Sequence, residues 1–462
     1  MARKEIKTLR DFPAVEELLQ SPELSGSVNG LPRPLAAEIM RDVIGGFKSQ
    51  LQSKRKAITH SNLVDAMQIA LLHWRDKEVR RVINATGIVV HTNLGRSPLG
   101  KALVDEISDS ISGYNNLELD LSSGKRGNRG EACEKYLALL TGAESTAIVN
   151  NCAAALFIIL NTLAARRKVL LSRGELVQIG GGFRIPDILK RSGAKLEEVG
   201  TTNITNLKDY TEAADSNTSM ILKVHKSNFV QAGFTKEVPL AKLVPLAQKN
   251  NLILVHDLGS GALVSARKTI GFDEPTPLQS IRTGAHVVCF SGDKLLGGVQ
   301  AGLIAGKKDL IEKIKRNPLF RIVRVDKIVI AALEKILKSY LSGRHENEIK
   351  LWELLSVSEA ELYKRAKALC QDLGNPEFIS VEATKSFIGG GGLPEAALSS
   401  VGLIFSKKHD ADRILSLFRR CDPPIIGRIE NDRLILDLKA IDTGELKVLE
   451  NSIRQVLQQL SK

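Results

Sequence analysis

The stretch Ser291-Gly292-Asp293-Lys294-Leu295-Leu296-Gly297-Gly298 decides the fold of this chain. It directly follows the apolar run 286–290, which is typical of a buried strand, and an earlier run, 252–255, leads in the same way to Asp257. Asp257 precedes Lys294 by 37 residues, enough chain for a helical crossover between neighbouring parallel strands. We therefore expect the two side chains to meet at one edge of a mostly parallel sheet.

A lysine and an acid at such positions have a specific chemistry. A lysine in a partly dry site loses its proton readily and can form a Schiff base, and a nearby acid can keep a pyridinium nitrogen protonated. Pyridoxal phosphate requires this pair of groups from a protein. Taken alone, the turn around Lys294 could equally be a plain surface loop, but the strand that ends at Asp257 argues against that interpretation.

A candidate phosphate loop precedes both strands. Asn150-Asn151-Cys152-Ala153-Ala154-Ala155 lies between an apolar strand ending at Val149 and the helical run 156–160. Small residues at a helix start let backbone N–H groups approach a phosphate, and the helix dipole favours the dianion. A capped core helix would show the same pattern, because Asn is a good N-cap. The position upstream of the Asp and Lys strands favours the phosphate loop.

Two arginine-containing segments are candidate anion sites. Arg96 ends the polar segment 84–96, which reads either as a connection between domains or as a pocket lining. Arg321 and Arg324 are three residues apart and would share one face of a helix or tight turn. Charge runs usually lie on solvated surface, but here the intervening residues are apolar, which favours a paired anion site.

The composition of the 462-residue chain predicts an ordinary soluble protein, with 43% hydrophobic residues and a mean hydropathy of −0.05. No apolar run has the length of a membrane span, and the first residues lack the apolar core of a secretion signal. The five cysteines are scattered without a Cys-x-x-Cys or Cys/His cluster, which predicts a reducing cytoplasm and argues against a structural metal site.

The chain is basic, with 65 Lys and Arg against 52 Asp and Glu, a net charge of +13 and a pI near 9.4. More than half of this excess falls in residues 307–344, directly after the candidate lysine. Such a balance predicts a polyanionic partner, although many proteins are basic without one.

The pattern of apolar and polar residues along the chain predicts three domains. Residues 1–80 form a small helical domain that ends in a basic linker. In residues 81–330, β-rich runs such as 146–149, 168–171 and 220–224 alternate with helices, as in a mostly parallel sheet covered on both faces. Residues 331–462 combine helices with short strands and predict a smaller α+β domain.

Several motifs together resemble bacterial selenocysteine synthase, the L-seryl-tRNA(Sec) selenium transferase family. They are Asn-Ala-Thr-Gly-Ile-Val-Val-His-Thr-Asn-Leu-Gly-Arg at 84–96, Asn-Asn-Cys-Ala-Ala-Ala at 150–155, Ser-Arg-Gly-Glu-Leu-Val at 172–177, His-Asp-Leu-Gly-Ser-Gly at 256–261, the lysine stretch at 291–298 and Arg-Ile-Val-Arg-Val-Asp-Lys at 321–327. The resemblance extends over essentially the whole chain. It implies a fold-type-I pyridoxal phosphate enzyme that assembles as a homodecamer of five dimers, with active sites between subunits and a tRNA-binding N-terminal domain.

The resemblance also implies residue roles. Lys294 would be the Schiff-base lysine, Asp257 the partner of the pyridinium nitrogen, and Asp293 an acid that assists loss of the seryl hydroxyl. The other implied ligands are Asn151, Cys152, Ala153 and Ser291 for the cofactor and Arg96, Arg321 and Arg324 for the phosphate of the selenium donor. Two positions depart from the family pattern, which usually has a third Asn in place of Cys152 and a proline in place of Val299.

The implied activity is conversion of L-seryl-tRNA(Sec) to L-selenocysteinyl-tRNA(Sec) with selenophosphate, through an aminoacrylyl intermediate on pyridoxal phosphate. The alternative is a related pyridoxal phosphate lyase acting on a small amino acid or amino sugar acid, which would need neither the N-terminal domain nor the basic segment. A tRNA-binding protein without catalysis is a third interpretation, and the intact Lys294 and Asp257 argue against it.

Overall fold

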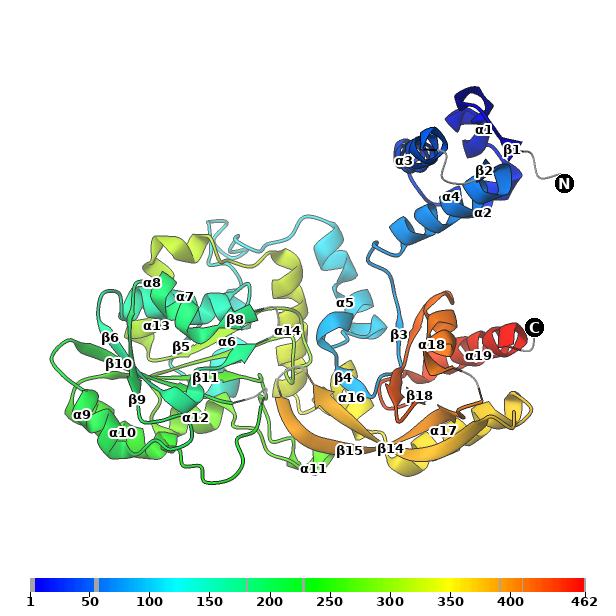
Figure 1. Cartoon of the computed structure of the whole chain (residues 1–462). Helices are drawn as coiled ribbons and strands as arrows, with labels where there is room; N and C mark the ends of the chain where they lie inside the picture. The colour runs from blue at the N-terminus through cyan, green and yellow to red at the C-terminus, as the bar shows by residue number, and fades with distance from the viewer. Residues whose placement is uncertain are drawn as a thin grey trace. The chain divides into compact units, whose positions relative to one another are not determined.

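The computed structural model describes residues 5–53, 58–179, 182–226, 229–389, 392–408 and 410–460, and the chain divides into two compact units, Met1–Arg81 and Val82–Lys462. The first unit is helical, as predicted for this part of the chain (Figure 1). Its elements are α1 (Val15–Leu19), α2 (Pro22–Val28), α3 (Arg33–Gln52), α4 (His60–Arg75) and the short antiparallel strands β1 (Glu5–Ile6) and β2 (Ile58–Thr59). They enclose a core of their own that includes Leu24, Met40, Leu63, Met67 and Leu71.

The second unit is built on a seven-stranded sheet in the order β5-β13-β12-β11-β10-β6-β9. All neighbouring pairs are parallel except those made by β13, which runs antiparallel to β12 and β5. The strands are β5 (Ser145–Val149), β6 (Lys168–Ser172), β9 (Lys195–Val199), β10 (Thr218–Val224), β11 (Ile253–Gly259), β12 (Val287–Ser291) and β13 (Gly302–Gly306). The apolar runs of the sequence therefore form strands of this sheet, as predicted.

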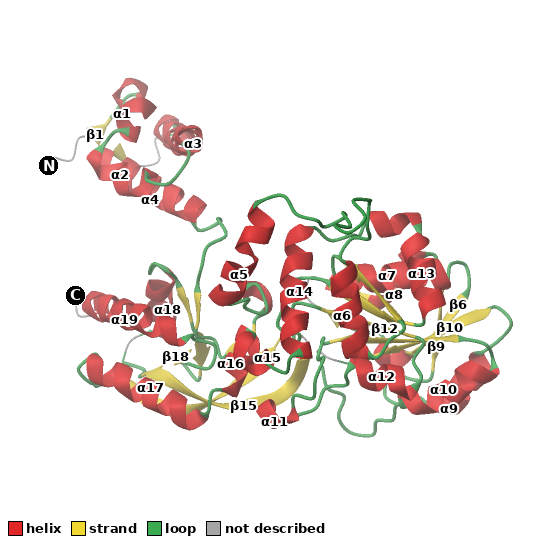
Figure 2. Ribbon diagram, turned by 180° about the vertical axis from the view of Figure 1, so that it is seen from behind, coloured by secondary structure: helices red, strands yellow, loops and turns green. Residues whose placement is uncertain are grey.

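Helices cover both faces of this sheet, as Figures 1 and 2 show. One face packs on α7 (Cys152–Leu163), α8 (Ile185–Ser192) and α13 (Lys308–Arg316), and the other on α9 (Leu207–Ala213), α10 (Leu240–Lys249), α12 (Pro277–Thr283), α6 (Glu131–Thr141) and α14 (Lys327–Leu341). Strands buried on both faces read as continuous apolar runs rather than as alternating ones, which explains why they stand out in the sequence. No described helix is both long and apolar enough to cross a membrane.

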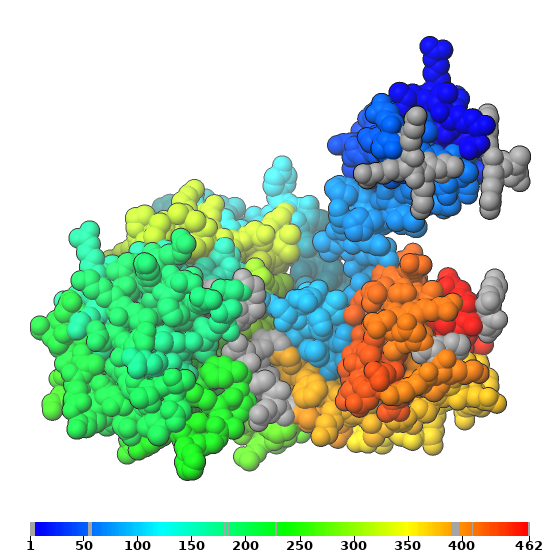
Figure 3. Space-filling model, in the orientation of Figure 1, coloured from blue at the N-terminus to red at the C-terminus, as the bar shows by residue number. Residues whose placement is uncertain are grey.

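A second sheet, in the order β17-β18-β15-β14-β4, carries α17 (Glu359–Asp372), α18 (Ala411–Arg419) and α19 (Leu446–Leu460). It contains β14 (Ile379–Gly389), β15 (Gly392–Phe405), β17 (Arg428–Glu430) and β18 (Arg433–Asp437). Its fifth strand, β4 (Ile88–Val90), comes from far earlier in the chain and pairs in parallel with β14. The preceding β3 (Ile83–Asn84) likewise pairs with β16 (Ile425–Ile426). In Figure 3 the light-blue atoms of this early segment lie against the orange atoms of the C-terminal region.

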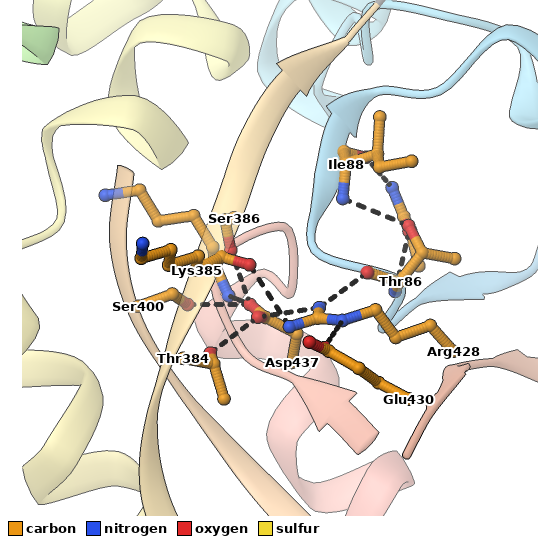
Figure 4. Close-up of polar contacts among 11 residues, drawn as sticks. Thr86, Ile88, Thr384, Lys385, Ser386, Ser400, Arg428, Glu430 and Asp437 are labelled. Atoms are coloured by element: carbon orange, nitrogen blue, oxygen red, sulfur yellow. Dashed lines mark hydrogen bonds and ion pairs between the residues drawn. The ribbon is translucent and has the colours of Figure 1, made fainter. Parts of the chain in front are cut away.

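A buried carboxylate holds this early segment in place (Figure 4). Asp437, which has no exposed surface, accepts a hydrogen bond from Nη1 of Arg428 at 3.0 Å, and the same nitrogen donates to the carbonyl oxygen of Thr86 at 2.7 Å. Three further hydroxyls, those of Thr384, Ser386 and Ser400, donate to the carboxylate at 2.6–2.8 Å. The sequence pattern grouped residues 83–90 with the central sheet, whereas the structure pairs them with the C-terminal strands. The sequence of a strand of two or three residues is too short to predict which strand it pairs with.

Candidate active site

The lysine stretch is a tightly bonded loop at the carboxyl end of β12. The amide of Gly292 donates to the carbonyl of Ala301 at 2.8 Å, and the amide of Leu295 donates to the carbonyl of Ser260 at 3.0 Å. Gly261, at a φ of 76°, lies so close to the carbonyl of Ser291 that a Cβ would collide with it. Within this loop Lys294 is buried, with 8% of its surface exposed.

One cavity of about 250 Å³ lies at the carboxyl ends of β5, β11 and β12 and contains most of the candidate residues. Its lining consists of Arg96, Asn151, Cys152, Ala153, Leu156, Asp257, Gly259, Ser291, Asp293, Lys294, Gln300 and Ala301. A crevice outside the carboxyl ends of the strands is where open α/β sheets bind their ligands. The lysine and the acid that are far apart in the sequence therefore face one space.

Asp257 lies among two thiols and the candidate lysine. Its Oδ1 is 3.6 Å from the Sγ of Cys152, and it is the register partner of Cys289 on the neighbouring strand. Burial raises the pKa of Asp257, and the positive charge of Lys294 and the two thiols act in the opposite direction. The hydrogen bond to Cys152 raises the pKa of Cys289, and burial raises it further. A carboxyl in this position gains from a cationic ring nitrogen that compensates its charge.

The start of α7 forms the wall beside Asp257. Asn151 is the N-cap of this helix, and its side chain accepts a hydrogen bond from the amide of Ala154 at 2.8 Å. The asparagine thus caps the helix, as its alternative interpretation predicted, while Asn151, Cys152 and Ala153 also line the cavity. A helix N-terminus with small residues suits a phosphate dianion, so the cap does not exclude the phosphate loop, which stays a prediction.

Arg96 and Asp293 form an ion pair at the cavity. Nη1 of Arg96 lies 2.5 Å from Oδ2 of Asp293, whose other oxygen, Oδ1, is buried without a hydrogen-bond partner among the described residues. Arg96 adopts a φ of 66° after Gly95, and its amide donates to the carbonyl of His91 at 3.0 Å. This turn brings the guanidinium from the β4 segment to the lysine loop.

Arg321 and Arg324 do not line the cavity of this chain. Both are exposed, and Arg324 lies 3.6 Å from Oε1 of Glu118. Glu118 also pairs with Arg126 and Arg129, and these cations, led by the hydrogen bond from Arg129, hold its pKa below the usual value. The segment nevertheless begins close to the cavity, because the amide of Asn150 donates to the carbonyl of Val323 at 2.8 Å.

The residues present fit pyridoxal phosphate. The cavity combines a buried lysine, an aspartate that burial leaves in need of a cationic partner, and a small-residue helix start. Among the described residues, Gln300, Gly259, Leu156 and the thiol of Cys289 belong to this surrounding and were missed in the sequence. The basic run Lys125-Arg126-Gly127-Asn128-Arg129 was the available signal for the Glu118 cluster.

The sequence of this chain is similar to those of known proteins. Residues 82–442 match the family described as L-seryl-tRNA selenium transferase. The chain is 42% identical over 452 residues to an L-seryl-tRNA(Sec) selenium transferase of Aquifex aeolicus, covering 95% of this chain and 99% of the relative. It is 40% identical over 446 residues to that of Carboxydothermus hydrogenoformans, covering 95% and 96%.

A solved structure shows the same fold. The D-glucosaminate-6-phosphate ammonia-lyase structure superposes with a TM-score of 0.61 at 18% identity, covering 84% of this chain and 99% of that one. The predicted fold class, a fold-type-I arrangement with a mostly parallel sheet, is confirmed.

Proposed function

The chain belongs to the L-seryl-tRNA selenium transferase family, and we propose that it converts L-seryl-tRNA(Sec) into L-selenocysteinyl-tRNA(Sec) with selenophosphate as the selenium donor. The observation that carries this proposal is the shared lining of one cavity by Lys294, Asp257 and the Arg96–Asp293 pair. The lysine and Asp257 suit pyridoxal phosphate, and the arginine adds a group that grips a phosphorylated donor.

Pyridoxal phosphate is the cofactor of this proposal. Lys294 would hold its aldehyde carbon and Asp257 its ring nitrogen, while the backbone of residues 151–153 would hold its phosphate and Ser291 would border it. When bound, the cofactor supplies a sink for the electrons that remain on the seryl Cα after its proton is removed.

The chain's own residues then divide the proton transfers. Lys294 Nζ is the base for the proton on the seryl Cα. Asp293 Oδ1, which is buried and without a partner among the described residues, accepts a hydrogen bond from the seryl hydroxyl, and the proton that Lys294 took from Cα leaves with this hydroxyl as water. Arg96 holds the other oxygen of Asp293 and so orients this carboxyl. The remaining N–H groups of Arg96 are available to the donor's phosphate.

Arg321 and Arg324 are proposed as further phosphate ligands. The hydrogen bond between Asn150 and Val323 supports this role, because it joins their segment to the start of α7. Their exposure leaves them available to a site shared between subunits, as in the homodecamer that the resemblance implies. The unit Met1–Arg81 is proposed as the tRNA-binding domain of a cytoplasmic enzyme.

A selenium-transfer assay with the purified full-length protein and seryl-tRNA tests the proposal. Radioactive selenium from selenophosphate should enter the amino acid released from seryl-tRNA(Sec), and not that released from seryl-tRNA(Ser). The variant Lys294→Ala should lose both this transfer and the visible absorbance of bound pyridoxal phosphate, whereas Lys249→Ala, on the exposed end of α10, should keep both.

Two outcomes would overturn the proposal. One is full selenium transfer by Lys294→Ala, and the other is equal use of both tRNAs. Ammonia release from a free amino acid or amino sugar acid, without activity on seryl-tRNA(Sec), would instead support the lyase alternative.

A further inference from the structure

Two thiols and a carboxylate lie close together at the cavity, which Cys152 and Asp257 line and behind which Cys289 is buried. The Sγ atoms of Cys152 and Cys289 and a carboxylate oxygen of Asp257 all lie within 4.8 Å of one another. The fold brings them together from three elements, since Asp257 and Cys289 are register partners on β11 and β12, and Cys152 begins α7 above them. Side chains of register partners on parallel strands project from the same face of the sheet.

The separation of Cys152 Sγ from Asp257 Oδ1 matches that of neighbouring ligands in a tetrahedral metal centre, and the other separations are at most 4.8 Å. Zn²⁺ binds thiolates at about 2.3 Å and carboxylates at about 2.0–2.2 Å, so neighbouring ligand atoms in a tetrahedron lie roughly 3.5–3.8 Å apart. The separation of Cys152 Sγ from Asp257 Oδ1 is 3.6 Å. Cys152 and Asp257 both line the cavity, which leaves a fourth position for water on that side. Three protein ligands with one open position are a common Zn²⁺ arrangement.

We propose that Cys152, Asp257 and Cys289 bind a thiophilic divalent cation such as Zn²⁺ when the cofactor is absent. This inference rests on the proposed function, because it assigns a second ligand to the carboxylate that would hold the pyridine nitrogen. Asp257 cannot serve both, so the ion and pyridoxal phosphate exclude each other. Asparagine at position 152, the residue that the resemblance leads one to expect, would leave a single thiol and a much weaker metal site.

Cobalt binding to the cofactor-free full-length protein tests the metal site. Co²⁺ bound by two thiolates gives a near-ultraviolet charge-transfer band, and added Zn²⁺ should abolish it at about one equivalent per chain. At saturating Co²⁺ the band should fall to about half in Cys152→Asn and in Cys289→Ala, with more Co²⁺ needed to reach saturation, and it should vanish in the double variant. Cys370→Ala, which lies on α17 outside the cluster, should bind as the parent does.

A competition experiment tests mutual exclusion. Preloading with Zn²⁺ should raise the pyridoxal phosphate concentration needed for half-maximal visible absorbance by about tenfold or more, and a chelator should reverse the effect. Near-ultraviolet circular dichroism of Cys152→Asn like that of the parent would show that lost binding is not lost folding.

The outcomes separate this inference from the proposed function. If the metal-free protein loads pyridoxal phosphate but gives no cobalt–thiolate band, the metal site is refuted and the enzyme assignment stands. If Co²⁺ binds but does not alter cofactor loading, the exclusion is refuted. If the metal-free protein never loads the cofactor, the assignment of Asp257 and Lys294 fails first.

Discussion

Replacing Asp437 by asparagine perturbs the buried network that anchors the β4 segment. The carboxylate accepts hydrogen bonds from five donors, namely Thr384, Ser386, Ser400, Arg428 and the amide of Lys439. Asparagine has nearly the same size but keeps one acceptor oxygen, so its NH₂ group must face some of these donors.

The loss of folding free energy in Asp437→Asn follows from the better of the two orientations of the asparagine amide. It keeps the oxygen toward Ser386, Ser400 and Lys439 and turns the nitrogen toward Thr384 and Arg428. The threonine hydroxyl can rotate to accept, whereas the guanidinium has only donors and loses its charged partner. Breaking a buried pair costs about 3–5 kcal/mol, and the 23% exposure of Arg428 favours the lower end, about 3 kcal/mol.

Scanning calorimetry of the full chain measures this effect. At about 2.1 cal/mol/K per residue, the unit Val82–Lys462 unfolds with an entropy of about 0.8 kcal/mol/K, so its Tm should fall by about 4 °C. The matched control is Asp432→Asn, whose carboxylate pairs with Lys407 at 3.1 Å but is 89% exposed, and its Tm should change by less than about 1 °C. A Tm change in Asp437→Asn no larger than in the control would refute the reasoning.

Three other predictions concern pH, the donor site and the tRNA. Burial lowers the pKa of His256 to about 3, so only the unfolded chain takes up a proton below about pH 6.5, and stability is lost as the pH falls. Between about pH 7 and pH 5 this uptake lowers the free energy of unfolding by about 2 kcal/mol. The urea midpoint should therefore drop less over this pH range in His256→Gln than in the parent, and an equal drop would contradict the role of His256. Arg96→Met should lower selenium transfer by about a hundredfold with unchanged cofactor absorbance, whereas lost absorbance would make Arg96 a cofactor ligand. The double variant Arg41→Glu/Lys48→Glu changes two exposed positions on α3 and should weaken tRNA(Sec) binding and its salt dependence in filter-binding assays. An affinity equal to that of the control Lys249→Glu would exclude this helix face from the tRNA site.

The central sheet and the cavity could be predicted because their signals are local. Apolar runs ending in Asp257 and in the lysine stretch are typical of parallel strands, and parallel strands deliver their carboxyl ends to one edge. Of the long β14–β15 hairpin, only the end of β15 at 403–405 was predicted as a strand, because a run of glycines (389–392) reads as a loop. Residues 390 and 391 of that run lie outside the described part of the chain.

Contacts between segments far apart in the chain could not be predicted from local sequence patterns. The five cysteines are scattered in the sequence, yet strand register places Cys289 beside Asp257 and helix placement adds Cys152. The spacing of Arg321 and Arg324 predicted a shared face, but it carried no information on which cavity that face meets, and within this chain they lie outside the cavity of Lys294. Register and helix placement depend on the whole fold rather than on neighbouring residues.

The pairing of β3 and β4 with C-terminal strands has a consequence for synthesis on the ribosome. Thr86 leaves the ribosome 342 residues before Arg428, its hydrogen-bond partner. Chains grow from the N-terminus at about 5–20 residues per second, so this early segment waits tens of seconds, unpaired, for β14, β16 and β18. Because the same segment carries Arg96 to the lysine loop, a nascent chain holds the partners that anchor the Arg96–Asp293 pair only after β18, which ends at Asp437, has been translated.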